Sequence, residues 1–514
     1  MAFSPSIQQK TFFDWISGGK GSCVLEAVAG SGKTTTLVEA LGLMKGYIFF
    51  GAYNKKIADE IAGRVPPSQF LTVSTMHAAG FRAWRKVAPK VKVDGDKLRN
   101  LFRELTFRDM EYGLLENPVL QLVSYGKQAG IGILKDHPID SDIRWLELIE
   151  HFNVEVFSDR GKNSGKDQTR DIIRLAKDVL TMSVKANKDV IDFEDMIFAP
   201  LFHNVSFFQF NWVLLDEAQD TNVTRRLLAL KLLKPGGRLV AVGDRHQAIY
   251  GFTGADANSL DLIREATKAV CMPLTTSYRC PKAVVAYAQQ WVKHIQAHEN
   301  APEGQVLTGE ISHLKDLAKV GDVVLCRFNA PLIKYVYTFI AAGIPARVEG
   351  RDIGAGLKNL AKRWKIKSLT AFSDRLIEWS EKEIKNYREK EENVKAQTLE
   401  DRVECMKVII SRVQSKDPHA MDPCGRIIEE IDEIFGKEDD RRPVVLFSSI
   451  HRSKGREWNN VVWLQTGPSG WAKLPWELEQ EDNLCYVAPT RAKKTLINID
   501  IRTGPAESAA APRA

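Results

Sequence analysis

Residues 22–36 of the chain read SCVLEAVAGSGKTTT. The apolar run at residues 22–26 predicts a buried strand, and a glycine-rich loop at residues 27–34 leads into a helix that begins at about Lys33. Backbone N–H groups of such a loop bind phosphate oxygens, and the following helix N-terminus adds a favourable field. Lys33 is expected to reach the β- and γ-phosphates, and the Thr34 hydroxyl to ligate Mg²⁺. The stretch therefore predicts a nucleoside triphosphate site that takes ATP and Mg²⁺.

The amino-terminal part of the chain alternates apolar runs with helical periodicity. Further strands are predicted at residues 47–52, 71–74, 212–215 and 239–242. Continuous apolar strands separated by helices favour a parallel sheet that is covered on both faces. From about residue 81 to 211, helical periodicity and charge dominate, which indicates an inserted helical region. Residues 158–167 (SDRGKNSGKD) predict a loop inside it.

A second strand-and-helix block begins near Leu274. Its predicted strands are residues 323–326, 444–448, 461–464 and 495–499. A charged helical stretch at about residues 351–440 interrupts this block, and residues 381–393 are expected to form a solvated helix face. The sequence thus predicts an α/β protein with two parallel-sheet cores, each with a helical insertion.

An acidic pair ends one of the apolar strands, in the segment WVLLDEAQD at residues 212–220. Buried parallel strands place their chemistry at the carboxyl edge, beside the phosphate loop. Asp216 is expected to hold Mg²⁺, directly or through water, and Glu217 to orient and deprotonate the attacking water. These residues alone predict a P-loop ATPase, and a kinase or an ATP-binding regulator would also fit.

Global composition sets weaker limits. A length of 514 residues suggests roughly three domains, and a net charge of +7 permits a polyanionic partner without requiring one. The seven cysteines are scattered without CxxC spacing, which argues against a zinc ribbon or a disulfide framework and favours a reducing compartment. The sequence shows neither a signal peptide nor a membrane span, so a cytoplasmic protein is expected.

Further motifs narrow the class of ATPase. Besides DEAQD at residues 216–220, they are residues 53–55 (YNK), 75–77 (TMH), 242–255 (VGDRHQAIYGFTGA), 277–280 (SYRC), 449–458 (SIHRSKGREW) and 486–493 (YVAPTRAK). Together and in this order they resemble the motifs of superfamily 1 DNA helicases of the UvrD/Rep (PcrA-like) family. The resemblance implies two RecA-like P-loop domains.

The resemblance assigns roles to the nucleotide-contacting positions. It implies that Gln9 reads adenine, with Gln8 as the alternative, and that Gln247 senses the γ-phosphate. The implied catalytic residues are Lys33, Asp216, Glu217, Gln247 and the two arginine fingers Arg279 and Arg491. The implied nucleotide-binding set is Gln9, Ala29, Gly30, Ser31, Gly32, Lys33, Thr34, Thr35, Tyr278 and Glu457, with Thr34 and Asp216 as metal ligands.

The resemblance also predicts a track for single-stranded DNA. Tyr250 and Phe252 are the strongest candidates for stacking on bases, and Tyr53 and His77 are weaker ones. The remaining DNA-binding candidates are Lys55, Arg327, His451 and Lys454. At three positions the chain departs from many relatives: Thr253 and Thr35 replace an arginine, and Ala52 replaces a phenylalanine.

The predicted domains follow from the two interrupted cores. Residues 1–80 with 190–273 form domain 1A and 81–189 insertion 1B; residues 274–350 with 440–503 form domain 2A and 351–439 insertion 2B, before a disordered tail at 504–514. By resemblance, the motor moves 3′ to 5′ on single-stranded DNA and acts at junctions with duplex, with replication or repair proteins as partners and no membrane. The alternatives are an ATP-switched loading factor and a helicase–nuclease fusion, for which we expect no room after residue 493.

Overall fold

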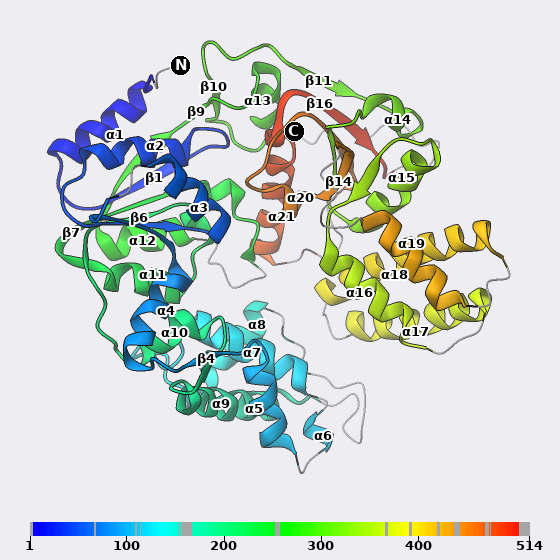
Figure 1. The fold of residues 1–514 in the computed structure, drawn as a ribbon, viewed down its shortest axis with the longest axis horizontal. Coiled ribbons are helices and arrows are strands. Elements are labelled where there is room, and N and C mark those ends of the chain that lie inside the picture. Colours follow the sequence, from blue (N-terminus) through cyan, green and yellow to red (C-terminus); the bar gives the residue numbers. More distant parts are fainter. Residues whose placement is uncertain are drawn as a thin grey trace. The chain divides into compact units, whose positions relative to one another are not determined.

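The computed structural model describes residues 4–502 except 66–67, 108–109, 114, 153, 155, 157–166, 252–257, 365–367, 390–392, 419–421, 436–442, 468–471 and 473. The chain divides into two compact units, Met1–Thr275 and Thr276–Ala514. Each unit contains a six-stranded parallel sheet (Figure 1). The predicted α/β class with two RecA-like cores is confirmed.

The sheet of the first unit is built from two separate stretches of sequence. In spatial order its strands are β3 (Leu71–Thr75), β2 (Ile48–Ala52), β6 (Phe210–Leu215), β7 (Leu233–Gly243), β1 (Cys23–Ala27) and β8 (Val270–Leu274). All neighbouring strands are parallel. The carboxyl ends of the strands therefore share one edge, and the amino ends share the opposite edge.

Helices cover both faces of this sheet. One face packs on α1 (Ile7–Gly18), α2 (Lys33–Ala40) and α3 (Lys55–Arg64), with Phe12 and Leu37 fully buried against Phe50. The other face packs on α4 (Met76–Val87), α10 (Asp195–Phe202), α11 (Val223–Lys231) and α12 (Ser259–Thr267), around Phe49 and Val213. Both faces of each central strand are buried, which explains their unbroken apolar runs.

A helical layer lies between β3 and β6 in sequence. It consists of α5 (Lys97–Thr106), α6 (Met110–Gly113), α7 (Glu116–Gln128), α8 (Asp142–Phe152) and α9 (Thr169–Ala186), with the short parallel pair β4 (Lys92–Val93) and β5 (Val190–Ile191). Trp145 and Phe102 are fully buried in its own hydrophobic core. This core makes the region a packed subdomain.

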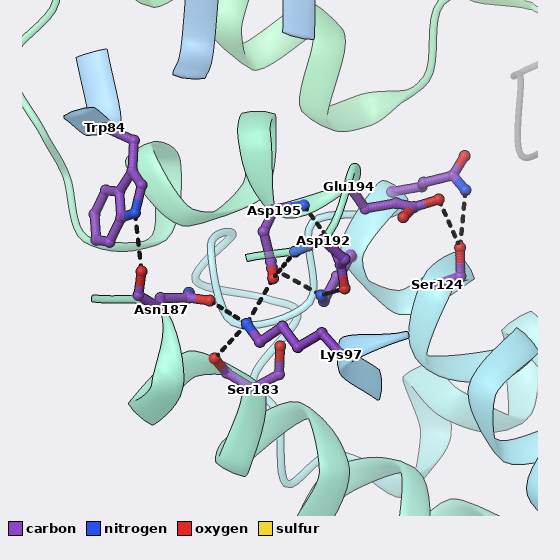
Figure 2. Close-up of polar contacts among 10 residues, drawn as sticks. Trp84, Lys97, Ser124, Ser183, Asn187, Asp192, Glu194 and Asp195 are labelled. Atoms are coloured by element: carbon purple, nitrogen blue, oxygen red, sulfur yellow. Dashed lines mark hydrogen bonds and ion pairs between the residues drawn. The ribbon is translucent and has the colours of Figure 1, made fainter. Parts of the chain in front are cut away.

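A buried ionic cluster joins α5 and α7 of this region to α10 (Figure 2). Lys97 Nζ lies 2.7 Å from Asp195 Oδ2, and Lys127 Nζ lies 2.5 Å from Asp192 Oδ2 and 2.7 Å from Asp195 Oδ1. Lys97 also donates to the Asn187 side chain at 2.6 Å. Burial lowers the pKa of Lys127, but Asp195 and Asp192 outweigh burial and hold it above its ordinary value. The cluster thus balances two cations with two carboxylates away from water.

The second unit repeats the architecture. Its strands, in spatial order, are β11 (Gln305–Thr308), β16 (Ala492–Asp500), β15 (Trp458–Gln465), β12 (Val323–Cys326), β14 (Val445–Ser449) and β13 (Ala346–Val348). All are parallel. A second, two-stranded pair joins β9 (Thr276–Ser277) and β10 (Gln296–Ala297).

Helices in the second unit include a group between β13 and β14. That group is α16 (Arg351–Ala361), α17 (Leu369–Glu389), α18 (Asn393–Lys416) and α19 (Pro423–Phe435), which lie together in Figure 1. The others are α13 (Lys282–Ala288), α14 (Leu314–Leu317), α15 (Asn329–Ala341), α20 (Ile450–Ser453) and α21 (Pro475–Val487). The α16–α19 group shares one hydrophobic core with the sheet through residues such as Phe339, Ile409 and Phe447.

Most predicted strands are present within one or two residues of the expected bounds, and the helix predicted from Lys33 begins at that residue. The solvated helix predicted at 381–393 falls partly on α17, although Ile384 and Tyr387 pack against the core. The loop predicted at 158–167 lies outside the described residues except for Asp167, and the tail at 504–514 lies wholly outside them. The predicted domain boundaries stay a prediction.

The seven cysteines are free thiols, four of them buried. Among the described residues, no helix has the length and apolarity needed to cross a membrane. No group of three or more metal-ligating His, Cys, Asp or Glu side chains occurs in the described part of the chain.

Candidate nucleotide and DNA sites

The phosphate loop lies between β1 and α2 at the carboxyl edge of the first sheet. Gly30 and Gly32 have positive φ values of 73° and 75°, which glycine adopts without a Cβ penalty. The buried Ser31 hydroxyl has no hydrogen-bond partner among the described residues. Ala29 is fully buried, and Lys33 and Thr35 are half-buried in the first turn of α2. The loop thus combines backbone N–H groups with the buried Ser31 hydroxyl, and both kinds of group can donate hydrogen bonds to phosphate oxygens.

Thr34 and Asp216 meet as the sequence predicts for a metal site. The Thr34 hydroxyl donates to Asp216 Oδ2 at 2.5 Å. Asp216 is almost fully buried, and burial, reinforced by the neighbouring Glu217 carboxylate, raises its pKa to about 6. A divalent cation at these two oxygens would stabilise the ionised carboxylate, so the residues fit Mg²⁺.

Glu217 has an unusual backbone. Its φ of 51° places a non-glycine residue in the left-handed region, where strain typically marks a functional site. Its carboxylate accepts a hydrogen bond from Gln219 Nε2 at 2.6 Å. Gln219 Oε1 in turn accepts from the Asp244 backbone N–H at 3.1 Å, and Gln247 Nε2 donates to Asp244 Oδ2 at 2.7 Å.

These contacts form a continuous chain from Glu217 through Gln219 and Asp244 to Gln247. It connects the loop after β6 with the loop after β7. The sequence placed Glu217 and Gln247 in the site but missed Gln219, whose side chain is buried between them. A Cβ on Gly243 would lie 2.5 Å from Gln219 Oε1, so this glycine makes room for the link.

The two candidate adenine-reading glutamines have different environments. Gln9 is 2% exposed; its Oε1 accepts from the Ser6 backbone N–H, and its Nε2 donates to Thr36 Oγ1 at 2.8 Å. Gln8 is half-buried and exchanges two hydrogen bonds with Thr275. Gln9 therefore holds α1 against the helix that follows the phosphate loop, and which glutamine reads the base stays a prediction.

Aromatic and polar side chains gather at the ends of β2 and β3. The rings of Tyr53 and Tyr250 stack with centroids 6.1 Å apart and 12° between their planes. Burial lowers the pKa of His77 to about 4, helped by the charge of Arg225, so its ring is neutral at physiological pH. Lys55 is exposed at the start of α3. Phe252, the other predicted stacking residue, lies outside the described residues, as does Thr253.

A polar pocket of about 440 Å³ opens beside these residues. Tyr53, His77 and Arg225 line it, and the same three residues line a smaller cavity that also touches Asp216 and Glu217. On its far wall, Asn222 Nδ2 donates to Gln128 Oε1 at 3.0 Å, which links α11 to α7. The sequence did not point to Arg225, because its only distinguishing feature there is that it lies shortly after the acidic motif.

In the second unit, the predicted arginine finger Arg279 pairs with Glu457 of the predicted nucleotide-binding set. Arg279 Nε lies 2.6 Å from Glu457 Oε2, and Lys493 Nζ lies 3.4 Å from Glu457 Oε1. Burial raises the pKa of Glu457, but the charges of Arg279 and Lys493 outweigh it and lower the net pKa. Tyr278 is 40% exposed, with its ring 4.8 Å from that of His298.

The other arginine, Arg491, is 1% exposed. Its guanidinium donates to the Val487 carbonyl at 3.0 Å, the Thr490 hydroxyl at 3.1 Å and the Arg456 carbonyl at 3.4 Å. These bonds hold the side chain against the end of α21.

The predicted DNA contacts of the second unit also lie near one another. Arg327 Nε pairs with Glu481 Oε1 at 2.9 Å. Burial lowers the pKa of His451 to about 3, and the charges of Arg327 and Lys454 add to the effect. His451 is therefore a neutral ring beside two cations. All three follow strands of the second sheet, at its carboxyl edge.

Known families match most of the chain. The UvrD/REP helicase N-terminal domain matches residues 13–268, and the UvrD-like helicase C-terminal domain matches residues 353–503. The chain belongs to the UvrD/Rep helicase family. The ordered motifs and both RecA-like cores agree with this membership.

Curated relatives of this family are similar over much of the chain. The F-box DNA helicase protein 1 of Schizosaccharomyces pombe is 23% identical, over 93% of this chain and 55% of the relative. A probable DNA helicase II homolog of Rickettsia felis is 25% identical, over 64% of this chain and 55% of the relative. The ATP-dependent DNA helicase PcrA of Bacillus subtilis is 25% identical, over 64% and 48%. The chain thus spans about half the length of the relatives it matches.

Proposed function

We propose that the protein is an ATP-dependent DNA helicase or translocase that moves 3′ to 5′ on single-stranded DNA. The observation that carries the proposal is the intact catalytic group of the first unit. In it, the phosphate loop, the Thr34–Asp216 pair and the strained Glu217 lie at one sheet edge. Membership of the UvrD/Rep family and the names of the relatives support DNA as the substrate.

The first unit supplies the groups that bind and hydrolyse ATP. Lys33 and the loop N–H groups bind the phosphates, and Thr34 with Asp216 holds Mg²⁺, which neutralises charge on the phosphate oxygens. Glu217 orients the attacking water and takes its proton. The hydrogen-bond chain from Glu217 to Gln247 links the catalytic base to the loop that carries Tyr250.

The second unit supplies the cations that complete the site. We propose that ATP binds in a cleft between the units and that Arg279 and Arg491 contact the γ-phosphate, where a guanidinium matches developing charge. Arg279 must then exchange its Glu457 partner for phosphate, which frees Glu457 to contact ribose. ATP binding would thereby close the cleft, and loss of the γ-phosphate would open it.

The boundaries 1–80 with 190–273, 81–189, 274–350 with 440–503 and 351–439 are part of this proposal. The joining of β1–β3 with β6–β8 in one sheet supports the first pair of ranges, whereas the boundary after residue 80 falls within α4 (Met76–Val87) and the one after residue 273 falls within β8 (Val270–Leu274). Work at single-strand–duplex junctions, in replication, repair or recombination, is the role that such a motor would serve.

The polar pocket beside Tyr53 is the proposed entry of DNA into the first unit. Its neutral aromatic rings offer stacking surfaces for bases, and Arg225 offers a cation for a phosphate. Arg225→Ala is expected to weaken binding to oligothymidylate and to reduce the slope of log K against log salt by about one. Lys185→Ala, an exposed lysine on α9, is the control; an equal loss in both variants would remove Arg225 from the track.

The decisive experiment is ATP-dependent strand displacement on matched duplexes with a 3′ or a 5′ single-stranded tail. Glu217→Gln should bind ATP and turn it over about 10²–10⁴-fold more slowly. Unwinding from the 3′ tail alone, lost in this variant, supports the proposal, whereas unwinding from the 5′ tail alone contradicts the polarity. DNA-stimulated ATPase without unwinding from either tail would indicate a translocase or a partner-dependent motor.

A further inference from the structure

An aromatic patch lies at the amino edge of the first sheet, opposite the ATP site. Tyr47 and Phe70 directly precede β2 and β3, and Phe208 lies just before β6. Because these strands are parallel, their starts share the edge opposite the phosphate loop. A five-residue strand spans roughly 17 Å at about 3.3 Å per residue, so the patch is separate from the catalytic carboxylates.

Five aromatic rings of the patch touch in sequence. The Tyr47 ring lies 5.5 Å from Phe70 and 5.2 Å from Phe208; Phe208 lies 5.0 Å from Phe210, and Phe210 lies 5.4 Å from Phe49. Phe49 and Phe210 are buried, but Tyr47, Phe70 and Phe208 are 37%, 46% and 53% exposed. A contiguous exposed aromatic cluster of this kind marks an interaction surface more often than a scattered apolar residue does.

A hollow enters the patch between the sheet and α4. Its cavity volume is about 220 Å³, and its apolar walls include Phe49, Phe208 and Leu232. Arg82 and Lys86 of α4 stand at its rim with Thr72. Such a hollow can take one large apolar side chain, but few polar groups are present to read the edge of a nucleobase.

The charge around the patch has one sign. The segments that build it are residues 44–48, 68–72, 79–86, 203–211 and 232–238, and they contain no aspartate or glutamate. Their cations are Lys45, Arg82, Arg85, Lys86 and Lys234, besides Arg238, whose guanidinium instead donates to carbonyls of Trp15, Ile16 and Gly21. Lys234 Nζ lies 5.2 Å from the centroid of the Tyr47 ring. Charge complementarity therefore favours an acidic occupant.

We propose that this patch is a docking site for an acidic segment of a partner protein that carries an aromatic anchor residue. The anchor fills the hollow beside Phe208, and the acidic residues lie against Arg82, Lys86 and Lys234. The site is independent of ATP hydrolysis, because none of its residues reaches the carboxyl edge of the sheet.

Fluorescence anisotropy of the full chain tests the proposal with a dye-labelled synthetic peptide that contains several aspartates and one phenylalanine. The wild type should bind it, with an affinity that falls as salt rises. Replacing the phenylalanine of the peptide by alanine, or making Phe208→Ala in the protein, should each weaken binding about tenfold or more. Lys86→Glu should also weaken binding and flatten its salt dependence.

Matched controls make the result specific. Phe193→Ala removes another exposed phenylalanine of the same unit, and Lys185→Glu reverses an exposed lysine elsewhere; both should bind the peptide as the wild type does. Unchanged ATPase activity of Phe208→Ala shows that this variant is folded. Absence of peptide binding to the wild type, or binding that Phe208→Ala and Lys86→Glu leave unchanged, overturns the proposal. Displacement of the peptide by oligothymidylate, with loss of oligothymidylate binding in Phe208→Ala, would instead make the patch a nucleic-acid site.

Discussion

Gln9 and Gln8 are neighbours in sequence but make different hydrogen bonds. Gln9 closes the first turn of α1 together with Ser6 and also bonds Thr36 of α2, all within a buried environment. Gln8 makes its contacts with Thr275 where water has partial access. The cost of losing a hydrogen bond is largest where the abandoned partner stays buried.

We therefore expect Gln9→Ala to lower the free energy of unfolding by about 1–3 kcal/mol, and Gln8→Ala by less. Chemical denaturation of both variants measures the difference. The ratio of ATP to GTP turnover, measured alongside, assigns the adenine contact to one of the two. Equal destabilisation by both substitutions would mean that burial at Gln9 does not set its role.

The titration of His77 gives the stability of the first unit a pH dependence. Its pKa is about 4 in the fold, against an ordinary value near 6.5. The unfolded chain therefore binds more protons between these values, and the free energy of unfolding falls as the pH falls from about 6.5 to about 4. The full penalty is roughly 1–3 kcal/mol.

His77→Gln should remove this part of the pH dependence. Urea unfolding of the variant and the wild type at pH 7 and at pH 5 checks it, and the gap between their midpoints should shift in favour of the variant at pH 5. A gap that is the same at both pH values would show that His77 titrates normally.

At the scale of elements, the buried ionic cluster holds α5 and α7 against the start of α10. Lys127 of α7 contacts both Asp192 and Asp195, and all three are at most 5% exposed in their side chains. Lys127→Met would leave two buried carboxylates with only Lys97 nearby. Breaking such a buried pair typically costs about 3–5 kcal/mol.

The double variant Lys127→Met/Asp192→Asn should recover a substantial part of that loss, because it also removes a carboxylate charge. A double-variant cycle in chemical denaturation measures the coupling. Additive losses from the two substitutions would show that the cluster members do not act together. Because Lys127 and Gln128 of α7 line the polar pocket beside Tyr53, the same variants also alter the wall of that pocket.

Three strands of the large sheets that the sequence failed to predict share one physical feature. β8, β11 and β13 are edge strands, and most of their side chains are exposed or half-buried. Continuous apolar runs predict the central strands, which are covered on both faces, but these three edge strands lack such runs. The phosphate loop follows β1 and Glu217 follows β6, and both are central strands that continuous apolar runs predict.

Gln219 and Arg225 show why the rest of the site was not predictable. Gln219 lies within the DEAQD motif without an assigned role and Arg225 lies outside the motifs, and the importance of both comes from groups distant in sequence, such as Asp244 and His77. Only the folded chain brings these groups together. The patch at Tyr47 was missed likewise, because its aromatic residues belong to three separate segments.

At the scale of the whole molecule, the proposed motor divides its chemistry between two units. The phosphate loop and Glu217 belong to the first, and Arg279 and Arg491 to the second. Arg491→Ala is expected to reduce DNA-stimulated ATPase by about 10³-fold or more, because an arginine finger acts mainly in the transition state. ATP binding, measured with a fluorescent analogue, should change little.

Lys494→Ala, a substitution close in sequence but outside the motif contacts, serves as the control for Arg491→Ala. Full ATPase activity in Arg491→Ala would mean that Arg491 is not an arginine finger. A parallel loss of stability in this variant is measured by thermal unfolding, since Arg491 also holds the end of α21.

The parallel order of the first sheet separates its two edges by the length of its strands. Residues that hydrolyse ATP follow the strands, and Tyr47, Phe70 and Phe208 precede or approach them. Selection on one edge therefore need not constrain the other. Across lineages, we expect Thr34 and Asp216 to stay invariant while the aromatic edge changes with the protein partners of each organism. New associations could then evolve without altering the rate of ATP hydrolysis.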